Sequence, residues 1–576
     1  MRLLLINWAR VWDGAQRGGG VNGYLLELAL ELASAGHEVC TLSSGTEDVP
    51  ELDAATNLPR PGRCTIRRHD DWRGLRVYEV INSPVLAPGI FQFRQPEVEI
   101  AAPELETEFA RFLALLRPDI VHFHNIEGFS AGCVRVAKRA QVAQGDAHGA
   151  AGTWPGARVL FSLHNYHAVC PQVYLMQRGV EACLDYNDGH DCIRCANSLE
   201  PHFDPLRERD RRTRETLARL TLAGRSIDHR RPAHQVAKLP YAPTHDAVQV
   251  LEPRPLPAEE RGVARALDAE ERAARLESLP LDAPERRPLE NDLRPQIHDP
   301  GREPTIFARR RGAMVAALNE CDAVLAVSTF VRDKFISLGV RASVIRAMTI
   351  GSRAVDHAAA WRARAARIGE ITPRAPDAPL RAIFMGYNNH YKGLWLLVEA
   401  LRAMPLDIRR RVALTVAALD LAGPTERRLR ELAPSLASLT LREGYAPHDL
   451  PWLLADQDCG IVPSVWWDNG PQTVMEFLAF GVPVVGARLG GIPDFVRDGE
   501  NGLLFRGNDA ADLAETLTRL TPSPDLVDRL SAAARRPIFP MKSVRDHASE
   551  MASLYAALVA QGPFASGVAE PAAGLA

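Results

Sequence analysis

Two acids eight positions apart, Asp468 and Glu476, are the residues of this chain most suited to chemistry. The apolar run 459–464 predicts a buried strand and 472–480 predicts a helix, so Asp468 falls in the loop between them and Glu476 about one turn into the helix. Ligands of open α/β sheets bind at the carboxyl ends of strands. Free N–H groups at a helix start suit a diphosphate, and carboxylates accept hydrogen bonds from sugar hydroxyls. The unit therefore predicts a nucleotide-sugar site.

A rare lysine precedes a second predicted helix. The chain has five lysines, at positions 138, 238, 334, 392 and 542. Lys392 lies between a predicted strand, 381–386, and a predicted helix, 394–403, where its ammonium could neutralise a leaving diphosphate. An ordinary exposed lysine is the alternative.

A glycine-rich turn follows the first predicted strand. Gly18, Gly19 and Gly20 stand directly before a predicted helix, and glycines there let the backbone approach an anion closely. A plain strand-to-helix connector is the alternative. The second predicted strand, 39–44, ends without the acid that dinucleotide-binding folds place there, so we do not expect a nicotinamide cofactor.

Two histidines, His124 and His164, end predicted strands near the amino terminus, and Asn165 follows the second. A histidine at a strand end often serves only as a structural hydrogen-bonding group. Two of them at one sheet edge point instead to a shared site.

Four cysteines lie close together in the sequence and end in a C-x2-C pair. They are Cys170, Cys183, Cys192 and Cys195. The set predicts a structural zinc site, with an iron–sulfur centre or unliganded thiols as alternatives. Metal analysis of protein purified under reducing conditions distinguishes them.

Short β-branched runs alternate with helical patterns over most of the chain, which predicts an α/β protein of parallel sheets. The predicted strands are 3–8, 38–44, 118–125, 158–165, 321–328, 342–348, 381–386, 411–419, 439–445, 459–464 and 483–488. They fall into two Rossmann-like, doubly wound domains that face a cleft.

The predicted boundaries assign every part of the chain to a domain, an insertion or a linker. An acceptor-side amino-terminal domain covers 1–197 and 305–355, with the cysteine loop at 170–195. A charged, largely irregular insertion with one helix, 257–279, covers 198–304. The remaining parts are an inter-domain linker at 356–380, a nucleotide-sugar-binding domain at 381–540, and a helix crossing back to the first domain, with a tail, at 541–576.

The composition is that of a large globular protein. The chain has 576 residues, of which 46% are hydrophobic and 24% charged, and its formal net charge is -3. This balance gives no global attraction to nucleic acid, so we expect no nucleic-acid partner. Without a visible signal peptide or membrane-spanning run, we expect a cytoplasmic protein that is free to contact the inner membrane face.

The motifs, taken together, resemble the family 4 retaining glycosyltransferases of GT-B fold. The resemblance rests on the segments 386–393, 463–471, 481–485, 490–494 and 498–504, with Glu476. It covers nearly the whole chain apart from the insertion. A cysteine-bearing loop occurs in a subset of that family.

The resemblance implies a role for each matched position. Glu476 matches the acid that holds the ribose hydroxyls of the nucleotide, Asp468 the acid near the donor sugar, and Lys392 the lysine on the diphosphate. His124 matches the histidine near the reacting sugar. Further matches on the donor side are Gly19, Gly20, Gly386, Asn469, Gly470, Pro471 and Thr473, and on the acceptor side His164 and Asn165.

Two positions depart from the family pattern. The first acid of the family is usually glutamate, whereas Asp468 is one methylene shorter. An arginine commonly follows the glycine matched by Gly386, whereas this chain has Tyr387. Stabilisation of the diphosphate would then depend more on Lys392 and on helix N-termini.

The resemblance implies a retaining glycosyltransferase of hexosyltransferase type. Its expected partners are a UDP- or GDP-sugar donor and a glycan or lipid-linked acceptor, in polysaccharide or cell-envelope biosynthesis. It needs no cofactor for catalysis. A catalytically silent nucleotide-sugar-binding homologue and a GT-B sugar epimerase or phosphorylase are the alternatives.

Overall fold

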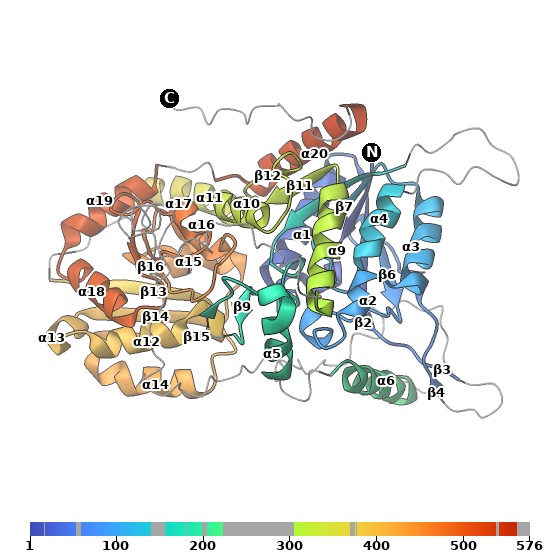
Figure 1. Ribbon diagram of the computed structural model, residues 1–576. Helices are drawn as coiled ribbons and strands as arrows, with labels where there is room; N and C mark the ends of the chain where they lie inside the picture. The colour runs from blue at the N-terminus through green and yellow to red at the C-terminus, as the bar shows by residue number, and fades with distance from the viewer. Residues whose placement is uncertain are drawn as a thin grey trace, which may run out of the picture.

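The computed structural model describes residues 1–16, 18–52, 59–139, 156–179, 181–198, 204–222, 304–368, 375, 377–536 and 541–561. Two sheets organise this part of the chain, one in each half of Figure 1. Within the described ranges, no helix combines the length and the apolar character needed to cross a membrane.

The amino-terminal sheet has eight strands in the order β12-β11-β8-β7-β1-β2-β6-β5, and all neighbours are parallel except β5 and β6. The strands, in that order, are Ile345–Ala347, Ala323–Ala326, Arg158–Leu163, Ile120–Phe123, Arg2–Ile6, Glu38–Glu47, Arg76–Ile81 and Thr65–Arg68. Leu3, Leu4 and Leu5 of β1 are fully buried, as expected of a central parallel strand covered on both faces.

The carboxyl-terminal sheet has six parallel strands in the order β15-β14-β13-β16-β17-β18. They are Ser438–Glu443, Val412–Leu419, Leu380–Tyr387, Cys459–Val462, Val484–Ala487 and Gly502–Phe505. The central pair, β13 and β16, brings the loops after both strands to one edge of the sheet. Two-stranded ribbons, β3 (Glu51–Leu52) with β4 (Pro59–Arg60) and β9 (Met176–Gln177) with β10 (Glu181–Ala182), complete the pairing.

Helices surround both sheets (Figure 1). The first group comprises α1 Gly19–Ser34, α2 Glu97–Ile100, α3 Pro103–Leu116, α4 Ala131–Arg139, α5 His190–Ser198, α6 Pro205–Leu222, α9 Ile306–Glu320 and α10 Thr329–Ser337. The second comprises α11 Arg353–Ile368, α12 Leu394–Ala403, α13 Leu406–Arg409, α14 Pro424–Leu432, α15 Leu450–Leu454, α16 Gln472–Ala479, α17 Ile492–Phe495, α18 Ala510–Leu520, α19 Pro524–Ala534 and α20 Val544–Gln561.

All of the strands expected from the sequence are present, with ends shifted by a few residues. Three strands of the two main sheets were missed, β5, β6 and β18, and so were the two-residue strands of both ribbons, β3, β4, β9 and β10. β5 is a charged edge strand, β6 carries the charged residues Arg76 and Glu79, and β18 is four residues long. None has the long apolar run that makes a buried strand visible in sequence.

The range assigned to the insertion and the range assigned to the linker both contain regular structure. Helix α6 lies in the first, where Arg209 pairs with Asp48 at 2.8 Å and so fixes the helix to the amino-terminal domain. The expected helix at 257–279 lies outside the described residues. In the second, α11 packs against α15 and α16.

Helix α20 follows the second domain in sequence but packs against α1 of the first (Figure 1). The Tyr555 hydroxyl is 2.7 Å from Nδ1 of His122, and the Tyr24 hydroxyl is 2.8 Å from Nε2 of His547. Tyr555 and Met551 are fully buried. The chain therefore returns to its first domain through a packed, hydrogen-bonded helix.

A buried charge cluster joins α2, α9 and the loop after β8. Arg310 makes a two-pronged ion pair with Glu99, at 2.7 and 3.0 Å, and donates to the backbone oxygen of His167 at 2.8 Å. Burial by itself would raise the pKa of Glu99, but the charges of Arg310 and His167 outweigh burial and lower this pKa to about 2.

Removing the cation of this cluster should destabilise the protein strongly. The change Arg310→Met leaves Glu99 buried without its guanidinium, so we expect a loss of about 3–5 kcal/mol of unfolding free energy at pH 7, measured by urea unfolding. The loss should shrink as pH falls from about 4.5, the ordinary pKa, toward 2, because wild-type Glu99 then also loses its charge.

The exposed pair Arg430–Glu426 provides the control, since Arg430→Met should cost less than about 1 kcal/mol. Equal losses of unfolding free energy for the two variants would contradict the claim that the buried cluster stabilises the protein more than an exposed ion pair does.

Candidate active site

Lys392 and Asp468 form an ion pair at the carboxyl edge of the second sheet. Lys392 ends a short 3-10 helix (His390–Lys392) after β13, and Asp468 lies in the loop after the neighbouring strand β16. Lys392 Nζ is 2.7 Å from Asp468 Oδ2, and the Ser464 hydroxyl donates to the same oxygen at 3.1 Å. Asp468 is 4% exposed, so its carboxylate is held by charge and hydrogen bonding inside the protein.

Glycines allow the two loops to meet. Gly393 has a φ of 71°, and a Cβ there would lie 1.8 Å from the backbone oxygen of Pro463. Gly490 has a φ of 58°, and a Cβ there would lie 2.5 Å from the backbone nitrogen of Asp468. No side chain fits in either place. These motif glycines therefore act by close packing around the ion pair.

Glu476 lies in α16, and its environment differs from that of Asp468. The Tyr445 hydroxyl donates to Glu476 Oε2 at 2.8 Å. Burial raises the pKa of Glu476 to about 7, and the bond from Tyr445 opposes the rise only in part. One strand–loop–helix unit thus carries a paired carboxylate and a second carboxyl group that titrates near neutral pH.

The glycine-rich turn meets this unit from the first domain. Gly19 and Gly20 form the first turn of α1, so they lie inside the helix that was expected to follow them. Gln472 Nε2, at the start of α16, donates to the Gly20 oxygen at 3.1 Å, and a Cβ at Gly19 would lie 3.6 Å from the Tyr387 hydroxyl. Two helix starts therefore lie side by side at the candidate site.

The predicted histidines form a neutral cluster at the edge of the first sheet. His124 Nδ1 is 3.3 Å from His164 Nε2, and the two rings stack with centroids 5.6 Å apart. Burial lowers the pKa of His124 well below its usual value, and burial with the nearby His547 lowers the pKa of His164 to about 3. Both rings are therefore uncharged at neutral pH and can offer hydrogen bonds but no positive charge.

A buried carboxylate organises the segment beside these histidines. Glu127 Oε1 accepts from Asn125 Nδ2 at 2.9 Å and from Asn165 Nδ2 at 3.1 Å, while Oε2 accepts from the Gly89 backbone at 2.5 Å. Asn165 was expected from the sequence, whereas Glu127, Tyr445 and Ser464 had no predicted role. Glu127 stands two positions after Asn125, which ends a predicted strand. This short spacing was the only feature of the sequence that could have marked Glu127 as part of the site.

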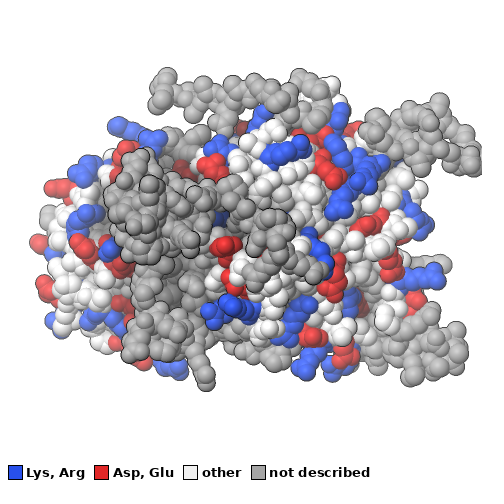
Figure 2. Space-filling view, viewed as in Figure 1, with Lys and Arg blue, Asp and Glu red and all other residues white. Residues whose placement is uncertain are grey.

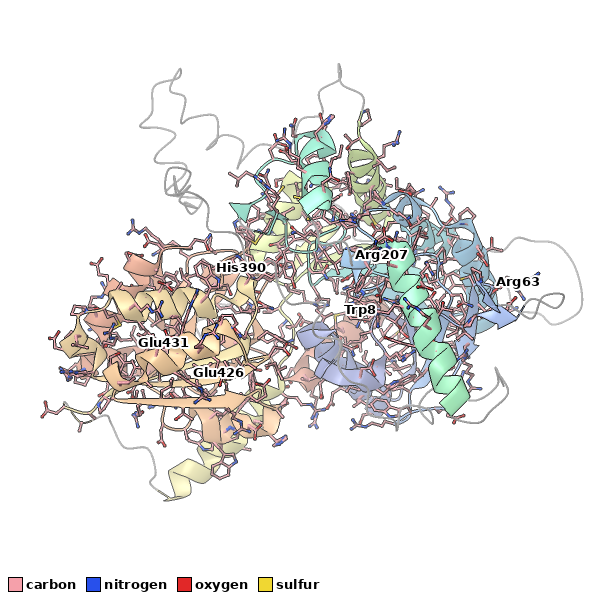
Figure 3. The ribbon with its side chains drawn as sticks, turned by 90° about the horizontal axis from the view of Figure 1, so that it is seen from below. Trp8, Arg63, Arg207, His390, Glu426 and Glu431 are labelled. Atoms are coloured by element: carbon pink, nitrogen blue, oxygen red, sulfur yellow. The ribbon has the colours of Figure 1, made fainter. Side chains whose placement is uncertain are left out.

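The remaining positions that the resemblance matched to the donor lie in the loop after β16, at the start of α16 and near the end of β13. The Nδ2 and Oδ1 atoms of Asn469 are buried and make no hydrogen bond within the described protein, so this amide is available to a ligand. Pro471 is the N-cap residue of α16, and Thr473 lies in its first turn. Gly386 is the last residue but one of β13 and has a φ of 142°. In Figure 3, His390 marks the end of this domain that faces the amino-terminal domain, far from Glu426 and Glu431.

The four clustered cysteines are buried thiols that form no disulfide. Burial raises the pKa of each, that of Cys192 to about 12. Among the residues that the structure describes, no three or more His, Cys, Asp or Glu side chains are arranged to hold a metal ion. These thiol positions do not fit a metal site as they stand, and structural zinc stays a prediction.

Two family models match this chain, one in each domain. The model described as Glycosyl transferases group 1 matches residues 372–536. The model described as Glycosyl transferase 4-like domain matches residues 19–183. The first range contains Lys392, Asp468 and Glu476, and the second contains the glycine-rich turn and both predicted histidines.

Several proteins with similar sequences are named as glycosyltransferases. The D-inositol 3-phosphate glycosyltransferase of Thermomonospora curvata is 37% identical over 180 residues, 29% of this chain and 37% of that protein. WcaL of Salmonella typhimurium, provisionally named a colanic acid biosynthesis glycosyltransferase, is 34% identical over 156 residues, 26% of this chain and 37% of that protein. These matches cover less than two fifths of either relative.

The fold is shared with a solved structure, the sucrose-phosphate synthase of Thermosynechococcus elongatus. It superposes with a TM-score of 0.52 at 15% identity, covering 97% of this chain and 99% of that one. The chain therefore has the predicted GT-B fold of two Rossmann-like domains, and residues 372–536 of its carboxyl-terminal domain match the group 1 model.

The raised pKa of Glu476 predicts a pH-dependent effect of its neutralisation. Folded protein holds this proton up to about pH 7, whereas an unfolded chain releases it near 4.5, so the contribution of Glu476 to stability falls as pH rises between these values. Glu476→Gln carries no charge at any pH. We expect this variant to gain roughly 1–3 kcal/mol over wild type at pH 8 and much less at pH 5, measured by urea unfolding.

The exposed acid Glu431, changed to Gln, is the matched control and should show no such trend. A stability difference between Glu476→Gln and wild type that does not vary with pH would contradict the assigned environment.

Proposed function

We propose that this protein is a retaining glycosyltransferase that moves a hexose from a UDP- or GDP-sugar to a hydroxyl of a glycan or lipid-linked acceptor. The Lys392–Asp468 ion pair carries the proposal, because it sets an ammonium and a carboxylate beside two helix starts in the domain that matches the group 1 model. The names of similar glycosyltransferases support the class of reaction.

In this proposal the donor lies mainly against the second domain. Glu476 accepts hydrogen bonds from the ribose hydroxyls, and Asp468 and the free amide of Asn469 contact the sugar. Lys392 and the N–H groups at the start of α1 oppose the diphosphate. Lys392 thereby shares its charge between Asp468 and the diphosphate, and the tyrosine at position 387 adds no charge of its own.

The acceptor lies on the first domain, beside His124, His164 and Asn165. In the proposed step, the bond between the sugar C1 and the diphosphate oxygen breaks while the acceptor oxygen bonds to C1 from the same face. Because attack and departure share one face, the configuration at C1 is retained, and the acceptor proton passes to the leaving diphosphate oxygen. Positioning of the two substrates and stabilisation of the developing diphosphate charge supply the catalysis.

The donor class is tested by ligand-induced stabilisation and by product release. A nucleotide sugar at 100 times its Kd should stabilise the folded protein by about 2.7 kcal/mol. A panel of UDP- and GDP-sugars is screened by melting temperature, and the stabilising donors are assayed for transfer and for release of UDP or GDP. Stabilisation without release or transfer would favour the silent nucleotide-sugar-binding alternative, and no stabilisation by any donor would contradict the proposal.

The proposal also includes where the protein acts in the cell. Cytoplasmic location and contact with the inner membrane face remain predictions. Figure 2 shows acidic and basic side chains interspersed over the visible face of the described residues.

Loss of the Lys392 ammonium should slow the chemical step. We expect Lys392→Ala to lower kcat by about 10²–10³-fold, the typical effect of removing one group that stabilises developing negative charge. Lys392→Arg preserves a cation beside Asp468 and should retain more activity, which separates loss of chemistry from loss of folding.

Lys542→Ala is the matched control, because Lys542 also pairs with an acid, Glu550, but lies outside the candidate site. Wild-type turnover by a folded Lys392→Ala variant would contradict the role proposed for this lysine.

A further inference from the structure

The segment that carries the first cysteine also reaches the other domain. We call residues 166–179 the tyrosine loop, after Tyr166 and Tyr174. The Tyr166 hydroxyl donates to the backbone oxygen of Trp467 at 2.9 Å. The Tyr174 ring stacks on Tyr391, with centroids 3.7 Å apart and an interplanar angle of 18°, and meets Trp466 edge-on at 5.0 Å.

The contacted residues are the immediate neighbours of the ion pair. Tyr391 precedes Lys392, and Trp467 precedes Asp468. The Val465 N–H donates to the Tyr391 oxygen at 3.0 Å, so the loops that carry Lys392 and Asp468 are also joined to each other. A shift of Tyr391 or of the two tryptophans would therefore move Lys392 relative to Asp468.

The backbone around Tyr174 is held in an uncommon conformation. Val173 and Leu175 have φ values of 78° and 53°, in the left-handed region that a β-branched residue rarely adopts. Local hydrogen bonds maintain it: Val173 N–H donates to the Cys170 oxygen at 2.8 Å, and Tyr166 N–H donates to the Val173 oxygen at 3.1 Å. Two strained residues on either side of one ring cost free energy, which favours a function for the placement of that ring.

The inner side of the loop is fixed in the first domain. Tyr166 is fully buried and stacks on Phe335 at 6.0 Å, and Leu175 and Met176 are also buried. Arg311 of α9 donates to the Val169 oxygen at 2.8 Å. The tyrosine loop is therefore held rigidly in the first domain. Its residue Tyr174 contacts the second domain, so the position of the first domain affects the loops that carry Tyr391 and Trp466.

We propose that Tyr174 is a positioning residue, whose stacking on Tyr391 holds Lys392 and Asp468 in the geometry that the donor diphosphate and sugar require. This inference rests on the proposed function and gives the cysteine-bearing loop a role that its sequence did not reveal. Tyr174 itself touches no reacting atom. Its effect passes through Tyr391 and Trp466.

The central test is a kinetic comparison of Tyr174→Ala with Tyr174→Phe, using the UDP- or GDP-sugar that wild type turns over. Misplacement of a catalytic group by about 1 Å can cost about 10²-fold in rate. We expect Tyr174→Ala to lower kcat by about that factor with a smaller change in KM, and Tyr174→Phe, which keeps the ring, to stay within about threefold of wild type. Wild-type kcat in Tyr174→Ala would overturn the proposal.

The matched control is Tyr78→Ala, because Tyr78 also makes an aromatic contact, with Phe112 of its own domain at 4.9 Å, but is not part of the tyrosine loop or its supports. This variant should keep the wild-type kcat. A loss as large as that of Tyr174→Ala would show general loosening of the domain and would overturn the positioning role.

A double-mutant cycle of Tyr174→Ala and Tyr391→Ala, followed by melting temperature, tests the contact without any assay of activity. Coupled residues should give a double variant whose loss is smaller than the sum of the single losses, by roughly 1 °C for an aromatic pair in a chain of this size. Additive losses would overturn the proposal even in an active enzyme. If the wild-type protein transfers sugar from no donor in the panel, the proposed function is wrong. That outcome is measured on the wild type and is therefore distinct from a failure of the positioning role, which is measured on the variants.

Discussion

The ion pair between Lys392 and Asp468 is the interaction on which the candidate site depends. An ionised carboxylate that is 4% exposed is costly unless opposite charge and hydrogen-bond donors reach it. Lys392 and Ser464 do so, because β13 and β16 are neighbours in the sheet. The approach also requires Gly393 and Gly490, since side chains at those positions would hold the loops apart. Strand order and glycine placement are thus conditions for the charge pair.

The environments of the acids and bases separate their chemical roles. Asp468 is paired with a cation, whereas burial keeps Glu476 close to its titration point at neutral pH. His124 and His164 are uncharged for the same reason, burial, which here disfavours the protonated ring. At this edge of the molecule, positive charge comes from Lys392 and from the starts of α1 and α16, whereas the two histidines offer hydrogen bonds only.

Two of the contacts that join the domains lie beside the candidate site. One is α20, which returns to the first domain and meets His122 through Tyr555. The other is the tyrosine loop, which reaches the second domain through Tyr166 and Tyr174. The first connection lies beneath the histidine cluster, and the second lies beside the ion pair. A change in the relative position of the domains would therefore affect the histidine cluster through α20 and the ion pair through the tyrosine loop.

The sequence by itself determined the fold class, most strands, and the positions of the acids on a strand–loop–helix unit, because hydrophobic periodicity and turn residues are local signals. Tertiary structure alone decided which groups meet. Lys392 pairs with Asp468, which is 76 positions away in sequence, and Tyr445 donates to Glu476, which is 31 positions away. Tyr174 stacks on Tyr391, a residue of the other domain. Burial, which sets the pKa of Glu476 and of the histidines, likewise arises only when distant segments pack, so no local pattern encodes it.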